Sequence, residues 1–252
     1  LRRKGIKVYC DATVTEILEE EGSLSCIITP NDGSGPVKTR AGQILMAIGR
    51  RPDVSRLLGK DISLDMKDGK IAVDSDFETS EPGVYAIGDV AARTQLAHVA
   101  AAQGTYVVEK IAGRPHSIKL EVVPNGMFVS LPIVPNCIYT DPEIATVGIT
   151  EEIAKKYGLK VRCGHFSMRD NGKSIITGEE HGFIRLLFEA YSNTIVGAQM
   201  MCPRATDMIG EIATAIANGL TAQEMSFAMR AQPTYNEGIG AAIEDAMRQN
   251  PV

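Results

Sequence analysis

Short apolar runs rich in β-branched residues open the chain and predict a small sheet. Clusters of turn residues separate these runs, as is usual between neighbouring strands. The plainest turn is Asn31–Pro36, which reads NDGSGP. The predicted strands are Ile6–Cys10, Thr13–Glu20, Leu24–Thr29 and Gln43–Ile48. Residues 1–48 are therefore expected to form a sheet fragment.

A strand, a turn and a helix are predicted in the next segment, residues 49–120. The apolar run Val84–Gly88 leads directly into Asp89. Beyond it, mostly apolar positions recur near helical spacing, and Gly113 supplies a C-terminal stop. The positions that mark this helix are Leu96, Val99, Gln103, Tyr106, Val107 and Ile111. Asp89 is thereby expected at the carboxyl end of a strand.

From about residue 121 the chain alternates strands and helices. Thr150–Gly158 predicts a short helix, because its glutamates lie in the first turn and its lysines in the last. Phe183–Ala190 and Thr194–Cys202 are expected to form a hairpin. A longer helix and a capping box for another follow. The helix face is marked by Ile209, Ile212, Ile216 and Leu220, and the box by Thr221 and Glu224. An antiparallel sheet with helices on one face is the expected arrangement.

Composition refines this picture mainly by exclusion. The 252 residues suffice for two domains of ordinary size, which is the division we expect. With 44% hydrophobic and 23% charged residues, the chain has the composition of a soluble globular protein, and apolar runs such as Ile44–Ile48 are too short to span a membrane. The formal charge is −5, and the lysines and arginines are scattered along the chain, so the sequence gives no basic patch that would bind nucleic acid. We expect a cytoplasmic protein with neither membrane nor nucleic acid as a partner.

The cysteines and histidines indicate neither a disulfide framework nor a metal site. The five cysteines are odd in number and include no close pair, so we expect reduced thiols that pack as small hydrophobic side chains. Cys10, Cys26 and Cys137, which lie in strand-like stretches, fit this role best. The four histidines show no metal-ligand spacing, so no zinc site is expected.

Asp89 and the segment after it are candidates for binding a cofactor. A carboxylate at the carboxyl end of a strand lies where ligands bind in open α/β sheets, and Asp89 could there accept a hydrogen bond from a ribose or ribitol hydroxyl. The alternative is that Asp89 only caps the following turn. Gln95–His98 would form the first turn of the predicted helix, whose unpaired N–H groups attract delocalised negative charge such as that of a reduced flavin. The two Gly-x-Gly pairs of the chain lack the strand and helix of a dinucleotide-binding motif.

Five motifs in a fixed order carry a resemblance to a known family. They are ILMAIGRRPD (Ile44–Asp53), TSEPGVYAIGDV (Thr79–Val90), QLAHVAAAQG (Gln95–Gly104), YTDPEIATVGIT (Tyr139–Thr150) and QPTYNE (Gln232–Glu237). In this order they resemble the flavin-dependent pyridine nucleotide–disulfide oxidoreductases, and among these they look most like the dihydrolipoamide dehydrogenases. The resemblance covers nearly the whole chain, and five ordered motifs are far more specific than any one of them.

The resemblance implies a fold and an order of domains. The fold class would be α/β and α+β: the carboxyl part of a flavoprotein with two dinucleotide-binding domains, followed by an antiparallel-sheet α+β dimerisation domain. Residues 1–48 would be a remnant of the NAD-binding domain, 49–120 the carboxyl part of the FAD-binding domain, and 121–252 the dimerisation domain. The GxGxxG motifs and the redox-active CxxxxC pair of the family are expected upstream of Leu1, so the chain resembles a carboxyl half.

The resemblance also implies roles for single residues. Gly88 and Asp89 would bind the ribitol side of FAD. Gly49 would lie beside the nicotinamide nucleotide, NAD or NADP, and Val14 would contact it as well. Four residues would lie along the isoalloxazine ring: Gln95, Leu96, Ala97 and His98.

The segment Arg230–Glu237 departs from the family at its most reactive position. The family reads HPTxxE here, and its His manages the thiol proton of the partner subunit's cysteine pair while its Glu orients the His. Gln232 stands in place of that His, and Glu237 retains the carboxylate. Glutamine does not titrate near neutral pH, so it cannot supply the ~10²- to 10⁴-fold of general acid–base catalysis. For Glu237, the alternative role is a carboxylate that stabilises a helix N-terminus.

Three interpretations of Gln232 remain open. In the first, the electron acceptor of this protein needs no general acid–base. In the second, the protein has kept the fold but not the dithiol chemistry. In the third, another residue acts as the acid–base, and Tyr235 is the nearest residue that titrates.

The resemblance implies a homodimeric FAD enzyme that passes electrons between NAD(P)H and a small disulfide or dithiol substrate, with a larger 2-oxoacid dehydrogenase complex as a further partner. We expect the 252 residues alone to be inactive. The competing interpretation is a non-catalytic dimerisation or interaction module with a vestigial flavin site.

Overall fold

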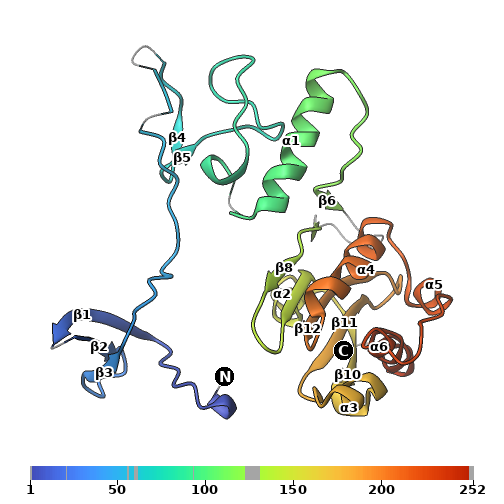
Figure 1. Ribbon diagram of the computed structural model, residues 1–252. Coiled ribbons are helices and arrows are strands. Elements are labelled where there is room, and N and C mark those ends of the chain that lie inside the picture. The colour runs from blue at the N-terminus through green and yellow to red at the C-terminus, as the bar shows by residue number, and fades with distance from the viewer. Residues whose placement is uncertain are drawn as a thin grey trace. The chain divides into compact units, whose positions relative to one another are not determined.

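The structure, a computed structural model, describes residues 2–20, 22–55, 57–59, 62–92, 94–122 and 131–249. The chain divides into two compact units, Leu1–Arg51 and Pro52–Val252 (Figure 1). Within the described ranges, no helix combines the length and the apolar character that crossing a membrane requires.

The first unit is a three-stranded antiparallel sheet in the order β1-β2-β3. Its elements are the 3₁₀ turn η1 (Arg2–Lys4) and the strands β1 (Ala12–Glu20), β2 (Ser23–Pro30) and β3 (Val37–Ala41). The strands predicted at Thr13–Glu20 and Leu24–Thr29 are thus confirmed. The carboxylate of Glu20 links the three strands, because it accepts from Lys38 at 2.5 Å and from the buried Ser25 at 3.1 Å. This ion pair between strands helps to explain why the polar segment β3 is a strand.

Two predicted strands of this unit are wrong. Ile6–Cys10 and Gln43–Ile48 have no strand structure, and the third strand is Val37–Ala41 instead. Strand β2 pairs with β1 on one side and with β3 on the other, so neither apolar segment has a neighbouring strand for its backbone groups. Leu45 and Ile48 are accordingly 91% and 88% exposed. Apolar composition without a pairing partner does not produce a strand here.

The second unit begins with short elements and one long helix. These are β4 (Met66–Lys67), β5 (Lys70–Ile71), the 3₁₀ turn η2 (Gly88–Val90) and α1 (Ala97–Ile111). Helix α1 is confirmed, and Gly113, with φ +62°, ends it as predicted. The strand predicted at Val84–Gly88 is wrong, because only Tyr85 forms a β-bridge, with Glu78. Every strand pair of the described residues is antiparallel, so this segment lacks the parallel neighbour that a central α/β strand needs.

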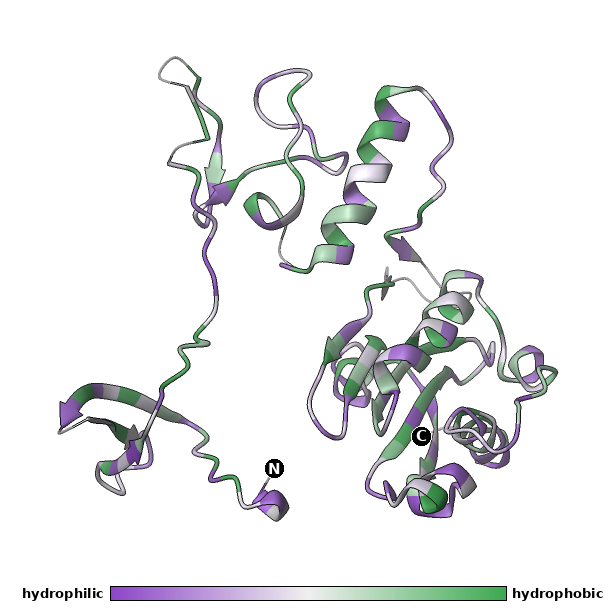
Figure 2. Cartoon of the chain, viewed as in Figure 1, coloured by the Kyte–Doolittle hydropathy of each residue, from purple (hydrophilic) through white to green (hydrophobic). Residues whose placement is uncertain are grey.

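A five-stranded antiparallel sheet in the order β10-β11-β12-β9-β8 forms the core of the remaining chain. Its strands are β8 (Asn136–Ile138), β9 (Ile144–Gly148), β10 (Val161–Ser167), β11 (Phe183–Glu189) and β12 (Ile195–Met201). The predicted hairpin is confirmed as β11 and β12. The separate pair β6 (Glu121–Val122) and β7 (Leu131–Pro132) precedes the sheet. Hydrophobic residues are frequent along the strands of the five-stranded sheet (Figure 2).

Helices cover both faces of this sheet, which corrects the expectation that they lie on one. Leu186 of β11 packs in a core with α4 and α6, whereas Leu187 packs on the opposite face with Ala154 of α2. Neighbouring strand residues point to opposite faces, so the two leucines separate the two layers. The helices are α2 (Glu151–Lys156), α3 (Gly172–Thr177), α4 (Ala205–Ala217), α5 (Ala222–Ser226) and α6 (Glu237–Arg248), with the 3₁₀ turn η3 (Met168–Asp170) before α3.

Local sequence signals set the ends of these helices as predicted. The Thr150 hydroxyl accepts from the N–H of Ile153 at the start of α2, and Thr221 and Glu224 form the capping box of α5. Glu151, however, pairs with Arg185 of β11 at 2.8 Å rather than with a lysine of its own helix. A tertiary contact thus replaces the pairing that the helix sequence suggests.

Helix α6 lies unusually close to β10 at one point. A Cβ atom on Gly164 would lie 1.9 Å from the carbonyl oxygen of Ala242, so only glycine fits there. The carboxylate of Asp245 accepts from the backbone N–H of His165 at 2.8 Å. These contacts hold α6, and the loop that leads into it, against the sheet.

Candidate functional site

The turn that carries Asp89 is locked against helix α1. Gly88, with φ +67°, is buried, and its backbone N–H donates to Oε1 of Gln103 at 2.8 Å. A Cβ atom at position 88 would lie 2.9 Å from the Cβ of Ala100. The chain therefore needs glycine at 88 both for its backbone angle and for this close approach. Asp89 is placed beside the first turns of α1 as a result.

The first turn of α1 has exposed backbone donors. Leu96 is the N-cap residue, and no side chain among the described residues caps the helix there. The exposed His98 is held through a 2.9 Å hydrogen bond between its Nε2 and the carbonyl oxygen of Pro135. Gln95 and Leu96 are half-buried and Ala97 is exposed. The segment predicted to contact flavin thus presents N–H groups at the positive end of a helix of 15 residues.

This set of groups fits part of a flavin nucleotide. A half-buried carboxylate can accept from the hydroxyls of a ribitol chain, and uncapped N–H groups at a helix start can donate to an electron-rich ring. The glycine contact between Gly88 and Ala100 keeps the two groups in one local framework. Sequence reasoning singled out both groups, but Asp89 lies in the 3₁₀ turn η2 and not at the end of a strand, which corrects that expectation. It also missed Gln103, whose helical spacing indicates only a buried position.

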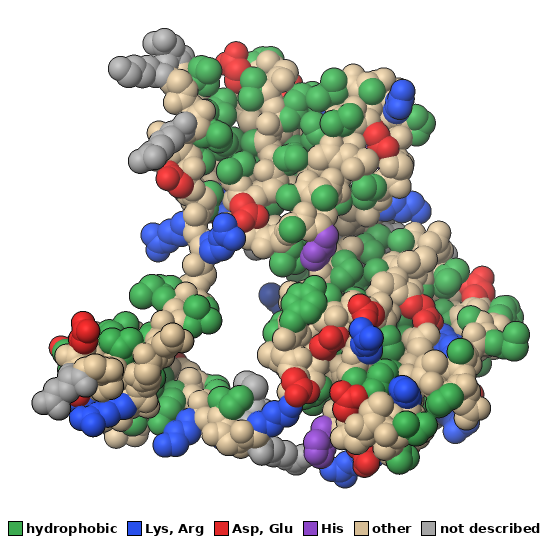
Figure 3. Space-filling model, in the orientation of Figure 1, with side chains coloured by type: hydrophobic (Ala, Val, Ile, Leu, Met, Phe, Trp, Pro, Cys, Tyr) green, Lys and Arg blue, Asp and Glu red, His purple; other side chains and the backbone are tan. Residues whose placement is uncertain are grey.

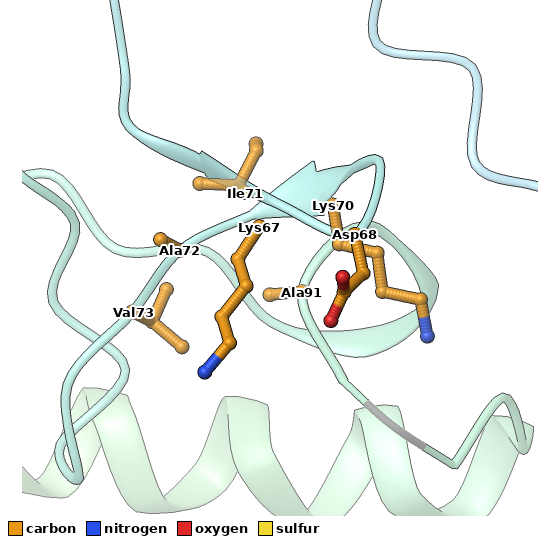
Figure 4. Close-up of a pocket in the computed structure, with 7 residues that line it drawn as sticks. All are labelled: Lys67, Asp68, Lys70, Ile71, Ala72, Val73 and Ala91. Carbon is orange, nitrogen blue, oxygen red and sulfur yellow. The ribbon is translucent and has the colours of Figure 1, made fainter.

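One cavity beside this turn does not include the predicted flavin residues. It has a volume of about 510 Å³ and is lined by the β4–β5 hairpin, the two residues after β5 and the residue after η2 (Figure 4). Its lining consists of Lys67, Asp68, Lys70, Ile71, Ala72, Val73 and Ala91. Lys70 is already engaged with the carbonyl oxygen of Ala92 at 2.6 Å. The cavity is therefore adjacent to the candidate flavin residues rather than formed by them.

Gly49 and Val14, the residues expected near the nicotinamide nucleotide, belong to the first unit. Gly49 has φ +105°, and the side chain of Val14 is 54% exposed on β1, beside a register shift between Val14 and Glu16. Both positions are open to solvent. Their expected contact with the nicotinamide nucleotide stays a prediction.

Gln232 and Glu237 line one cavity of about 650 Å³. The loop between α5 and α6 supplies one wall, and residues around η3 and the face of α6 supply the others. The remaining lining residues are Phe166, Asp170, Asn171, Gly172, Ser226, Ala228, Arg230, Gly240, Ala241 and Glu244. The structure thus brings together the two residues that the sequence singled out for the acceptor side.

Glu237 is bonded to its own loop. It is the first residue of α6, and its Oε2 accepts from the backbone N–H of Thr234 at 2.9 Å. The Gln232 side chain is exposed and makes no hydrogen bond to any described residue. This arrangement gives Glu237 the helix-start role that we weighed as its alternative.

Tyr235 is turned away from the reactive position. Its hydroxyl donates to Glu179 at 2.5 Å and lies 2.9 Å from the hydroxyl of Thr177. Burial raises the pKa of Tyr235 above its usual range, and the hydrogen bond to Glu179 raises it further. A tyrosine held in this way is a poor general base near neutral pH.

The thiols differ in their exposure to water. Burial raises the pKa of Cys163 to about 11 and that of Cys202 to about 12. Cys202 is fully buried, whereas Cys10 is exposed and Cys26 and Cys137 are only half-buried. The expectation of a buried Cys10 is wrong, because its segment forms no strand. In the described part of the chain, no three His, Cys, Asp or Glu side chains cluster as a metal site would require.

Comparisons with known proteins identify the family of this chain. The family described as pyridine nucleotide-disulphide oxidoreductase matches residues 1–104, and its dimerisation domain matches residues 134–243. Dihydrolipoyl dehydrogenases of Rhizobium etli and Geobacillus stearothermophilus are 32% and 33% identical over 98% of this chain. The chain spans about half the length of these relatives, 49% and 50%.

Solved structures show the same fold. LpdA from Mycobacterium tuberculosis superposes with a TM-score of 0.82 at 24% identity, over 98% of this chain and 50% of that protein. The HOCl-induced flavoprotein disulfide reductase RclA from Escherichia coli superposes with a TM-score of 0.81 at 17% identity, over 98% of this chain and 53% of that protein. The likeness extends across nearly all of the described elements.

Proposed function

This chain belongs to the pyridine nucleotide–disulphide oxidoreductase family, and from this premise we propose that it forms part of an FAD-dependent oxidoreductase acting between NAD(P)H and a disulfide-type or other small acceptor. The observation that supports this most directly is the turn at Gly88, which is locked onto α1 and sets Asp89 beside an uncapped helix start.

On this proposal, Asp89 would accept hydrogen bonds from the ribitol chain, and the first N–H groups of α1 would donate to the ring. Bound FAD would supply the redox chemistry, which is hydride exchange with the nicotinamide and electron transfer to the acceptor. The protein orients the ring and supplies charge at its edge. Gly88 and Gln103 act indirectly, because they hold the turn to which Asp89 belongs.

For the acceptor, we favour one whose reduction needs no protein base. Gln232 cannot take up a proton, and the bonds of Tyr235 to Glu179 and Thr177 remove it as a substitute. Turnover of a disulfide or dithiol substrate would then depend on proton transfer through water or a carboxylate of the cavity, and we expect this route to be slow. We also propose a homodimer in which the 134–243 domain of one subunit completes the site of the other.

The experiment that tests the cofactor proposal is flavin retention by the full-length protein. Visible flavin absorbance is expected in the purified protein, and Asp89→Ala should weaken FAD binding roughly 10- to 100-fold, as the loss of a hydrogen bond to a charged group predicts. Asp65→Ala is the matched control, because Asp65 is an exposed carboxylate of the same unit. Protein without flavin, or equal FAD affinity in both variants, would reject the proposal.

A second candidate is a non-catalytic dimerisation module with a vestigial flavin site, and the loss of a titrating group at Gln232 favours it. The two candidates differ in turnover. The enzyme oxidises NADH with some small acceptor, whereas the module does not under any condition. The 252-residue chain by itself is expected to be inactive. Lipoamide reduction or NADH oxidation by that chain alone would contradict this.

A further inference from the structure

The loop Arg230–Asn236, which carries Gln232, is tied at both ends to one carboxylate on α4. Oε1 of Glu211 accepts from Nη2 of Arg230 at 2.6 Å, and Oε2 accepts from Nδ2 of Asn236 at 2.9 Å. The Arg230 side chain is only 8% exposed, so this ion pair is largely shielded from solvent. Charge-assisted hydrogen bonds are roughly twice as strong as neutral ones. Glu211 therefore clamps the loop more firmly than an exposed ion pair would.

The middle of the loop is held from the other side. Nδ2 of Asn171 donates to the carbonyl oxygen of Thr234 at 3.0 Å, while its Oδ1 accepts from the N–H of Ser174. Asn171 is 2% exposed, which makes it a buried bridge between α3 and the loop. Tyr235 adds its bond to Glu179. Elements from three parts of the domain thus fix the loop backbone.

Gln232 differs from its neighbours in this loop. Arg230, Thr234, Tyr235 and Asn236 each make a side-chain or backbone bond to a residue outside the loop, whereas the amide of Gln232 is exposed and unbonded among the described residues. A flexible loop would not need four such anchors. The loop is therefore held in place on either side of Gln232, whose side-chain amide lines the cavity and is free to contact a bound molecule.

We propose that Glu211 is a positioning residue, which fixes where the loop presents Gln232 on the acceptor side of the site. The proposal rests on the proposed function for its catalytic meaning, because Gln232 affects turnover only if the loop faces a reacting centre. Glu211 does not line the cavity that contains Gln232, so it would act through Arg230 and Asn236. Its loss frees both ends of the loop together and leaves the cation of Arg230 without its partner in a shielded position.

The first test uses trypsin on the full-length protein, because the bond after Arg230 becomes cleavable only when the loop opens. Glu211→Ala should raise the rate of cleavage at Arg230–Ala231 at least roughly tenfold, which corresponds to about 1.4 kcal/mol. Glu211→Gln should give an intermediate rate, because its amide oxygen still accepts from Arg230. The matched control is Asp207→Ala on the same helix, whose carboxylate pairs with the exposed Arg204 and does not contact the loop.

The outcome is decided at that one bond, read by mass spectrometry. Faster cleavage there in Glu211→Ala and Glu211→Gln, with Asp207→Ala unchanged, supports the clamp. Cleavage at the wild-type rate in Glu211→Ala overturns it. If Glu211→Ala is cleaved at many sites because the whole domain unfolds, the rate of Glu211→Gln at Arg230–Ala231 decides by the same criterion.

The second test asks whether Glu211 acts through Gln232. Gln232→Ala is measured in the wild-type and in the Glu211→Gln background, with kcat and KM for the acceptor determined separately. A positioning role predicts a higher KM in Glu211→Gln and a several-fold smaller effect of Gln232→Ala in that background. Strictly multiplicative effects would reject coupling between the two residues. A wild-type protein without turnover would reject the proposed function, whereas the cleavage test would still decide the clamp.

Discussion

The backbone N–H of Gly88 donates a 2.8 Å hydrogen bond to Oε1 of Gln103, and both groups are buried. This bond joins the turn that carries Asp89 to the second turn of α1. A buried donor that loses its acceptor is costly, since no water replaces the bond. The position of Asp89 therefore depends on a side chain that lies 15 residues after Gly88.

Replacing Gln103 should loosen this turn. Gln103→Leu keeps the size of the side chain but leaves the Gly88 N–H unpaired, so the free energy of unfolding should fall by about 1–3 kcal/mol. Urea denaturation provides the measurement. Thr105→Ala is the control, because Thr105 is exposed on the same helix and bonds only to Ala101. An equal loss of stability in both variants would show that the Gln103 bond contributes little.

Alanine substitutions at Gly88 and Gly83 should separate the free-energy cost of a left-handed backbone from the cost of steric overlap with a neighbouring side chain. At Gly83, φ is +78° and no described atom lies within 4 Å of an added Cβ, so Gly83→Ala should lose only the ~1–2 kcal/mol of the left-handed backbone. Gly88→Ala adds the contact with Ala100 and should lose about 1–3 kcal/mol more. It should also release FAD from the full-length protein. Similar stability of the two variants would mean that the turn shifts without cost.

A histidine at position 232 should restore acid–base chemistry if the acceptor is a disulfide or dithiol. Gln232→His is expected to raise dithiol-dependent turnover by up to ~10²-fold, the lower end for general acid–base catalysis, because Glu237 is engaged with Thr234 and does not orient the new side chain. The rate should gain a pH dependence near about 6.5, which the wild-type lacks. A flat rate would show that Gln232 is not the limitation.

The hairpin after β11 should make the domain sensitive to acid. Burial alone would raise the pKa of Glu189, but hydrogen bonds from Ser192 and Tyr191 outweigh it, and the pKa lies below its ordinary 4.5. The carboxylate therefore contributes stability above pH 4.5, and this contribution is lost as the pH falls through the lowered pKa.

Glu189→Gln tests this pH dependence directly. The variant should be less stable than the wild-type at neutral pH, and the difference should shrink at acid pH, where the wild-type carboxylate takes up its proton. Thermal unfolding across a pH series measures the effect. Glu180→Gln serves as the control, because Glu180 is exposed. A stability difference that stays constant with pH would contradict the assignment.

The large exposed apolar surface of residues 57–90 is relevant to stability measurements on the chain alone. Leu57, Ile62 and Val84 are 59%, 55% and 41% exposed, and hydrophobic side chains are numerous on the surface of this part of the molecule (Figure 3). They surround an apolar cavity of about 750 Å³. Patches of this kind favour association, so unfolding experiments need to be checked for concentration dependence.

Sequence reasoning was most accurate where structure is local. The caps at Thr150 and Thr221, the hairpin of β11 and β12, and the stop at Gly113 depend on residues within a few positions of one another. It was least accurate for strands. Ile6–Cys10 and Val84–Gly88 have suitable composition, but a strand also requires a neighbour with free backbone groups, and composition does not reveal the neighbour.

The ordered motifs, and through them the family, could be read from the sequence alone, because each motif is a short run whose chemistry depends on its own residues. Only the tertiary structure decided how Asp89 is held, that Tyr235 is turned toward Glu179, and that Glu211 bridges Arg230 and Asn236. These contacts join residues between 15 and 56 positions apart along the chain. They depend on how helices pack on the sheet, and packing brings together side chains whose spacing in sequence carries no periodic signal.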